Sequence, residues 1–261
     1  MTLDYSTDGQ VAVLTLNRPE VLNAFDDELG KQVLEGVRRA SGDESIRCIV
    51  VTGAGRAFCS GEDLGALAQS YEEGGALELG RVLVERYNPL IRAIRSAPKP
   101  VVAALNGIAA GAGASVALAC DFRVASTDAK LSVAFAKVGL VPDSGALWFL
   151  TRMVGASKAW EMAALGQVVG AAECLRLGLV HTVAPRDEFE STWRSFAQML
   201  ASGPTRAFAL TKQLTATATE RSLSEQLDAE VEAQSVAGRT HDHREGVLAF
   251  LAKRPPRFEG R

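Results

Sequence analysis

The chain has 261 residues, of which 47% are hydrophobic and 23% are charged, and its formal net charge is −3 at pH 7. Such a length and composition are ordinary for a globular protein with one large α/β domain, or one domain with an appendage. The small negative charge provides no overall attraction to nucleic acid or to an anionic membrane, so we expect neither as a partner. A local basic patch could still hold a phosphorylated ligand.

The four cysteines show no C-x-x-C spacing, so we expect neither a disulfide framework nor a zinc site. This pattern suits a reducing compartment. The first residues, Met1 to Tyr5, have neither the basic nor the apolar region of a signal peptide, and we therefore predict a cytoplasmic location. Residues 101–120 carry no charge and are long enough to span a bilayer, but Asn106 and three glycines divide them into a strand, a turn and a small-residue helix.

Strands and helices alternate along the first half of the chain. Apolar patterns predict strands at 11–16, 46–52, 101–105 and 122–125, and helices at 26–39 and 77–94. This alternation predicts an α/β fold with mostly parallel strands.

The strand pattern nearly vanishes from about Ser157 onward. Helical spacing predicts helices at 158–165, 187–201, 205–217, 223–237 and 243–252. The pair Gly203-Pro204 is our boundary between a core of residues 1–202 and a C-terminal helical region of residues 203–261.

Two glycine-bearing turns lie about fifty residues apart, at residues 58–64 (FCSGEDL) and 106–115 (NGIAAGAGAS). Each comes just after a buried apolar run, 48–52 for the first and 101–105 for the second, and each precedes a possible helix start. Backbone N–H groups at a helix start lack partners within the helix and carry partial positive charge. Two such turns side by side could aim two donors at one oxygen, forming an oxyanion hole. The alternative is that the glycines only permit tight turns.

The order and spacing of these turns resemble the crotonase superfamily, the enoyl-CoA hydratases and isomerases. Residues 17–24 (NRPEVLNA) and 119–122 (ACDF) are further family-like stretches, and the resemblance covers nearly the whole chain. It implies a crotonase-like spiral of ββα repeats. It also implies that the C-terminal helices cover the active site and build a homotrimer or a dimer of trimers.

The resemblance makes the backbone N–H groups of Glu62 and Ala112 the oxyanion donors. Hydratases of the family carry two glutamates that share the activation of water and the delivery of a proton. At those two places this chain has Ser115 and Phe135.

A different family position is filled, because Asp143 coincides with the aspartate of several isomerases and of the dehalogenase branch. One base that takes a proton and returns it nearby is enough to move a double bond. The apolar segment 146–150 would raise the pKa of this aspartate by desolvation. Alternatively, Asp143 caps a helix that starts near Gly145. The Glu62 side chain is a second candidate for a direct role, or it faces solvent beside Asp63.

Within the superfamily, the chain looks most similar to the epoxyphenylacetyl-CoA isomerases, which convert an epoxide into an oxepin and can shift a Δ3 double bond to Δ2. Residues 110–114, 135–145, 148–150, 242–246 and 253–256 carry this likeness. We therefore predict an acyl-CoA isomerase with Asp143 as its base. The alternatives are a hydratase with atypical acid/base residues and a non-catalytic acyl-CoA-binding homologue.

Coenzyme A is expected as the carrier of the substrate, and no cofactor or metal is expected. Family positions that cradle coenzyme A correspond to Arg18, Leu22, Ala24, Ser60, Glu62, Asp63, Leu64, Ala112 and Lys253. Arg18 could meet a phosphate, and Lys253 or Phe258 could complete the site from this subunit or a neighbouring one. Both basic residues could equally be solvated charges. Phe135, Trp148 and the helix at 77–94 are candidates for the acyl pocket or, alternatively, for the core.

Two other enzyme classes match the glycine-rich segment only partly. Residues 113–117 approach the G-x-S-x-G elbow of serine hydrolases, but the last position is alanine. The G-x-G at residues 111–113 lacks the third glycine of a dinucleotide-binding loop, where Val116 stands.

Overall fold

The computed structural model describes residues 2–65, 68 and 78–261. Residue 1 lies outside the described residues, as does most of the loop between about 66 and 76. Residue 77, with which the helix predicted at 77–94 begins, also lies outside them.

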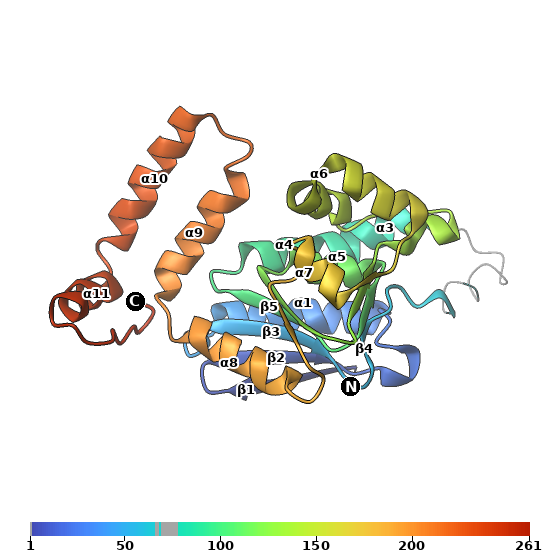
Figure 1. The fold of residues 1–261 in the computed structure, drawn as a ribbon, viewed down its shortest axis with the longest axis horizontal. Coiled ribbons are helices and arrows are strands. Elements are labelled where there is room, and N and C mark those ends of the chain that lie inside the picture. Colours follow the sequence, from blue (N-terminus) through green and yellow to red (C-terminus); the bar gives the residue numbers. More distant parts are fainter. Residues whose placement is uncertain (1, 66–67, 69–77) are drawn as a thin grey trace.

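The larger of two sheets has six strands in the order β1-β2-β3-β5-β7-β10 (Figure 1). Its strands are β1 (Leu3–Asp8), β2 (Val11–Leu16), β3 (Cys48–Gly53), β5 (Val101–Leu105), β7 (Phe122–Ser126) and β10 (Thr182–Ala184). Only β1 runs antiparallel to its neighbour, and the other pairs are parallel. The four strands predicted from the sequence all form here, while β1 and β10 were not predicted.

In the smaller sheet, three of the four strands each follow a strand of the larger one, and β9 follows α6 (Ala146–Leu165). The sheet comprises β4 (Ala57–Cys59), β6 (Ile108–Ala110), β8 (Lys130–Ser132) and β9 (Val169–Gly170), in that spatial order. The chain thus passes from β3 to β4, from β5 to β6 and from β7 to β8 before each return. This repeated passage is the expected spiral of ββα units.

Helices cover both faces of the six-stranded sheet. Strand residues alternate between the faces, as the period of two requires: Leu14, Val51 and Ala103 belong to the main core, and Val13, Val50 and Val102 to a second one. The main core is closed by α1 (Asp27–Gly42), α4 (Asn88–Ser96), α5 (Ala112–Ala119), α6 (Ala146–Leu165) and α7 (Ala171–Arg176), and the second by α8 (Phe189–Ala201).

The helix predicted at 77–94 is divided in the described part of that range. It consists of α3 (Leu79–Val82), a π-helical turn (Leu83–Tyr87) and α4. The predicted helix at 158–165 is the second half of α6, which continues through a kink where Gly155 has φ 77°. A π turn inside a helix is often associated with a functional site.

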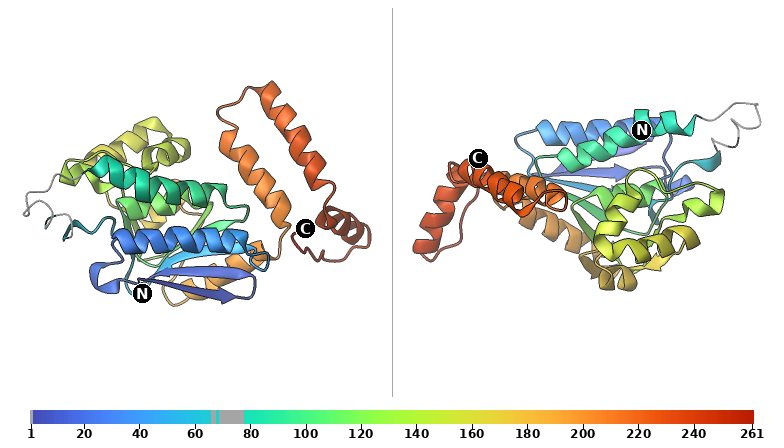
Figure 2. Two further views of the ribbon diagram at one scale, coloured as in Figure 1. Left: turned by 180° about the vertical axis from the view of Figure 1, so that it is seen from behind. Right: turned by 90° about the horizontal axis from the view of Figure 1, so that it is seen from above.

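Three C-terminal helices extend away from the two sheets: α9 (Thr205–Thr217), α10 (Leu223–Ala237) and α11 (His241–Leu251) (Figures 1 and 2). The first two match the predicted ranges to the residue. Polar contacts join this region to the core, because Lys212 Nζ lies 2.7 Å from Asp121 Oδ2 and Arg47 Nε donates to Thr205 Oγ1 at 2.9 Å. The division at residue 202 stays a prediction.

The uncharged stretch at 101–120 forms β5, β6 and α5, as its glycines indicated. Across the described ranges, the structure contains no helix that combines the length and apolar character needed to cross a membrane.

Candidate active site

The two glycine turns lie against each other. A side-chain carbon placed on Gly61 would be 3.6 Å from the Ala112 nitrogen and 3.1 Å from the Ala110 carbonyl oxygen. Gly61 has φ 108°, a backbone conformation that residues with a side chain rarely adopt. Both this conformation and the close neighbours of Gly61 therefore favour glycine. The strands predicted before these turns form as β3 and β5, but the two short strands that follow them were not predicted. The short strands β4 and β6 intervene, and each begins within or just before the turn motif.

The Glu62 N–H group points away from the strand pairing beside it. Phe25 N donates to Gly61 O at 2.7 Å, and Asp63 N donates to Phe25 O at 2.9 Å. Because successive N–H groups along an extended chain point to opposite sides, the intervening N–H of Glu62 faces away from Phe25. The structure gives it no acceptor among the described residues.

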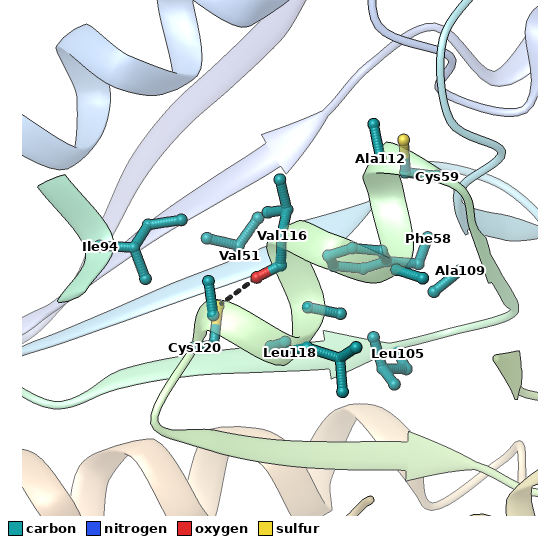
Figure 3. Close-up of a cluster of buried hydrophobic side chains, with 14 of the residues drawn as sticks. Val51, Phe58, Cys59, Ile94, Leu105, Ala109, Ala112, Val116, Leu118 and Cys120 are labelled. Atoms are coloured by element: carbon teal, nitrogen blue, oxygen red, sulfur yellow. Dashed lines mark hydrogen bonds between the residues drawn. The ribbon is translucent and has the colours of Figure 1, made fainter. Parts of the chain in front are cut away.

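The Ala112 N–H group lies at the start of a helix that is buried along its whole length. Ala112 is the first residue of α5, whose eight residues are all buried, and a first-turn N–H has no acceptor within its own helix. A side-chain carbon on Gly113 would be 2.5 Å from Cys59 O, so glycine permits this close approach of α5 to β4. Figure 3 shows Cys59 and Ala112 at one end of the buried cluster.

Asp143 precedes α6 in a partly buried loop. Its carboxylate accepts a hydrogen bond from Ser144 Oγ at 2.8 Å. Burial raises the pKa of Asp143, the charge of Glu62 raises it further, and the Ser144 hydrogen bond lowers it. The capping alternative is wrong, because the helix cap is Gly145 and no side chain caps this end of α6. The Asp143 carboxylate therefore has no structural role as a helix cap.

The two positions that carry glutamates in hydratases have other roles here. Ser115 is fully buried, and its Oγ lies 3.2 Å from Asp143 O and 3.3 Å from Gly111 O. It thereby connects the first turn of α5 to the Asp143 loop. Phe135 is buried in the main core, as expected of a core residue. Trp148 is 38% exposed, and the Arg152 guanidinium lies over its ring.

The Glu62 carboxylate neither faces open solvent nor stands unpaired. Arg86 Nη1 lies 2.8 Å from both of its oxygens, and the Tyr87 hydroxyl donates to one of them. Arg86 also pairs with Asp27 at the start of α1. Arg86 and Tyr87 were missed from the sequence, where they carried no signal beyond helical spacing. Both Glu62 oxygens already accept hydrogen bonds from protein groups, so Asp143 is the better candidate for a base.

Two of the segments predicted to cradle coenzyme A lie against each other. Residues 18–24 lie against the turn at 60–64, because Ser60 N donates to Leu22 O at 3.0 Å. Arg18 donates to Ala24 O at 2.7 Å and to Asp63 Oδ2 at 3.0 Å. Arg18 thus joins the two segments by hydrogen bonds and is not a solvated charge.

A buried asparagine in this cradle was not singled out from the sequence. Asn23 donates to Ala54 O at 2.9 Å and to Ala57 O at 2.8 Å, which fixes the loop ahead of β4. Its place inside the family-like stretch at 17–24 was the available signal.

The C-terminal candidates do not reach the cradle within one copy of the chain. Lys253 follows α11, which both views place at the end of the molecule opposite β4 (Figures 1 and 2). The Phe258 carbonyl instead accepts a hydrogen bond from Arg47 at 2.8 Å. Leu64, by contrast, is next to the first turn and 52% exposed. The contribution of Lys253 from a neighbouring subunit stays a prediction.

A cavity of about 270 Å³ lies elsewhere, between the core and α9. Its lining includes Arg95, Asp121, Phe122 and Lys212 and no residue of either glycine turn, so it does not belong to this site. In the part of the chain that the structure describes, no three His, Cys, Asp or Glu side chains are grouped to hold a metal ion.

Comparisons with known proteins identify the family and the fold of the chain. The family model described as enoyl-CoA hydratase/isomerase matches residues 6–261. A Rhodobacter capsulatus protein named "Probable enoyl-CoA hydratase" is 46% identical, with 100% of this chain and 98% of that protein covered. The 1,2-epoxyphenylacetyl-CoA isomerase of Escherichia coli is 43% identical, with 96% and 95% covered. The crystal structure of an enoyl-CoA hydratase from Bacillus anthracis superimposes with a TM-score of 0.93 at 29% identity, with 100% of both chains covered. The chain belongs to the enoyl-CoA hydratase/isomerase family and has its crotonase fold.

Proposed function

We propose that this enzyme is an acyl-CoA isomerase that uses Asp143 as its single acid/base group. The observation that carries the proposal is the combination of a partly buried carboxylate with two backbone N–H groups that lack acceptors among the described residues. Ser115 Oγ, 3.2 Å from Asp143 O, links the aspartate loop to the helix that presents the Ala112 N–H. The relative named as an epoxyphenylacetyl-CoA isomerase supports the same choice.

The proposed reaction moves one proton. The Glu62 and Ala112 N–H groups donate to the thioester oxygen of a 3-enoyl-CoA. Asp143 takes a proton from C2, and the bonding electrons form a dienolate whose charge rests on that oxygen. Asp143 then returns the proton to C4, leaving the 2-enoyl thioester with no atom gained or lost. Each preplaced donor contributes roughly 3 kcal/mol and the base roughly 3–5 kcal/mol, so the hole matters as much as the base.

Opening an epoxyphenylacetyl-CoA to an oxepin is a second isomerisation for which the same groups are suited. The substrate and the product again have the same composition, and the thioester oxygen again carries charge. The reaction requires no group beyond the coenzyme A thioester, which is the substrate.

Hydration is the competing activity, supported by the name of the Rhodobacter relative. Against it stand the two substituted positions, because Ser115 is hydrogen-bonded within the protein and Phe135 is buried in the core. Neither can activate water as a carboxylate does. A third candidate, a non-catalytic acyl-CoA binder, is favoured by the same substitutions but does not account for Asp143.

We also propose that the chain forms a homotrimer or a dimer of trimers. The C-terminal helices expose large apolar side chains, among them Phe250 at 83%, Leu223 at 76% and Leu251 at 72%. Large contiguous patches of exposed apolar side chains mark interaction surfaces, and we propose that these side chains form one. Such an assembly would bring the Lys253 of another copy to the cradle, and light scattering would give the mass of the particle.

Incubation with a panel of acyl-CoAs tests the proposed function. The panel comprises crotonyl-CoA, a 3-enoyl-CoA and the epoxide of phenylacetyl-CoA, with products analysed by mass and absorbance. We expect products of unchanged mass from the last two, with a conjugated 2-enoyl thioester from the 3-enoyl substrate. A gain of one water on crotonyl-CoA alone would favour the hydratase. Binding of all three without turnover would favour the binder.

A further inference from the structure

Glu62 presents two groups with opposite effects on an oxyanion. The Glu62 N–H is a proposed donor to the oxyanion, but the carboxylate of the same residue is negative. The enolate oxygen would form close to that carboxylate, and the repulsion between the two negative charges would raise the barrier to enolate formation. An acidic residue at this position therefore needs a counter-charge.

Arg86 supplies that counter-charge from a confined position. Its side chain is 12% exposed and contacts both Glu62 oxygens at 2.8 Å through Nη1. Its aliphatic part crosses α1 at Gly30, where a side-chain carbon would come within 2.6 Å of it. Residues on α1, the first turn and the π-helical turn thus fix the guanidinium in place.

The π-helical turn at Leu83–Tyr87 places two donors on the same carboxylate. Arg86 and Tyr87 are adjacent in sequence, and both bind Glu62. Burial, and then the charge of Glu62, raises the pKa of Tyr87, so its hydroxyl remains a donor at neutral pH. The carboxylate is therefore oriented by two groups, of which only Arg86 offsets its charge.

We propose that Arg86 is a positioning residue of the reaction, which offsets the Glu62 carboxylate so that the neighbouring N–H can stabilise an oxyanion and Asp143 can act as a base. The inference rests on the proposed function and extends it to a residue that does not touch the substrate. It predicts that loss of Arg86 is harmful mainly because Glu62 remains.

The charged and titratable groups around this pair are few among the described residues. Asp27 approaches Arg86 from α1, and Tyr87 approaches Glu62 from the π-helical turn. Cys59 lies on β4, where burial raises the pKa of its thiol to about 12 and keeps it neutral. Glu62 is thus the charge that acts on Asp143, whose pKa it raises after burial.

A double-mutant cycle with Arg86→Gln and Glu62→Gln tests the inference on the full-length protein with a 3-enoyl-CoA. We expect Arg86→Gln to lower kcat by about tenfold to a hundredfold with little change in KM. The double variant should recover most of that loss, because the uncompensated charge is gone. Arg86→Lys should recover part of it, since a lysine keeps the charge but not the planar fork.

The control is Arg81→Gln, whose exposed side chain pairs only with Glu85 in the described structure, and it should leave kcat unchanged.

The pH profile separates this role from a merely structural one. An uncompensated Glu62 charge favours the protonated form of Asp143, so Arg86→Gln should move the acidic limb of kcat/KM to higher pH. Glu62→Gln should move it to lower pH. Nuclear magnetic resonance of carbon-13-labelled aspartate reads the same Asp143 shifts without any turnover.

Equal losses in Arg86→Gln and the double variant, with an unmoved acidic limb, would overturn the inference. If Arg86→Gln does not fold, the comparison of the double variant with Glu62→Gln decides: without a carboxylate to offset, loss of Arg86 should change kcat little, and a tenfold or larger loss would overturn the inference. Absence of turnover in the unaltered enzyme would instead count against the proposed function, and the magnetic resonance shifts would still decide the role of Arg86.

Discussion

Asp143→Asn is expected to reduce kcat by about 10²–10⁴ while leaving acyl-CoA binding nearly unchanged. The amide keeps the shape of the side chain and can still contact Ser144, but it cannot take a proton from carbon. Steady-state assays with a 3-enoyl-CoA would measure kcat, and calorimetric titration with a saturated acyl-CoA would measure binding.

The matched control is Asp187→Asn, an exposed aspartate just before α8, which should retain full activity. In the unaltered enzyme, kcat/KM should fall as the pH drops through the pKa of Asp143. Because burial raises that pKa, the fall should begin at a higher pH than for an ordinary aspartate. Undiminished isomerisation by Asp143→Asn would show that another group is the base.

Ala112→Pro is expected to lower kcat/KM by about 10²–10³ without unfolding the protein, because it removes one proposed oxyanion donor. Proline is tolerated at the first position of a helix, where its missing N–H has no helical acceptor. Ala112 occupies that position in α5, so the backbone can accept the change. The comparison of thermal unfolding with turnover separates loss of the donor from loss of the fold.

Ala171→Pro provides the control for this substitution. Ala171 is also the first residue of a helix, α7, and also follows a glycine. It lies outside the proposed site, so activity should be retained at similar stability. If the two proline variants lose activity equally, the effect of Ala112→Pro is structural and the proposed hole is not supported.

The long apolar runs and the C-terminal helices could be predicted from the sequence because their signals are local. The helices α9 and α10 match their predicted ranges, since amphipathic spacing and the Ser222–Glu225 capping box act within one segment. The short strands β4, β6, β8 and β9 could not be predicted, because two or three residues of strand exist only through pairing with distant partners.

The site divides in the same way. The positions of Glu62, Ala112 and Asp143 could be proposed from motif order, and the contact between the two glycine turns agrees with it. The pairing of Glu62 with Arg86 joins residues 24 positions apart through a π turn, whose formation depends on tertiary contacts rather than on local propensity. The internal pairing of Arg18 with Asp63 was hidden for the same reason.

The convergence of the Glu62 and Ala112 N–H groups on one thioester oxygen can be measured directly from the carbonyl stretch of a bound ligand. Butyryl-CoA labelled with carbon-13 at the thioester carbon does not react, and its labelled band is resolved by infrared difference spectroscopy. Two aligned hydrogen bonds weaken the C=O bond, so we predict a band at lower frequency on the enzyme than in water, with most of the shift lost in Ala112→Pro. A bound band at or above the frequency in water would contradict the account.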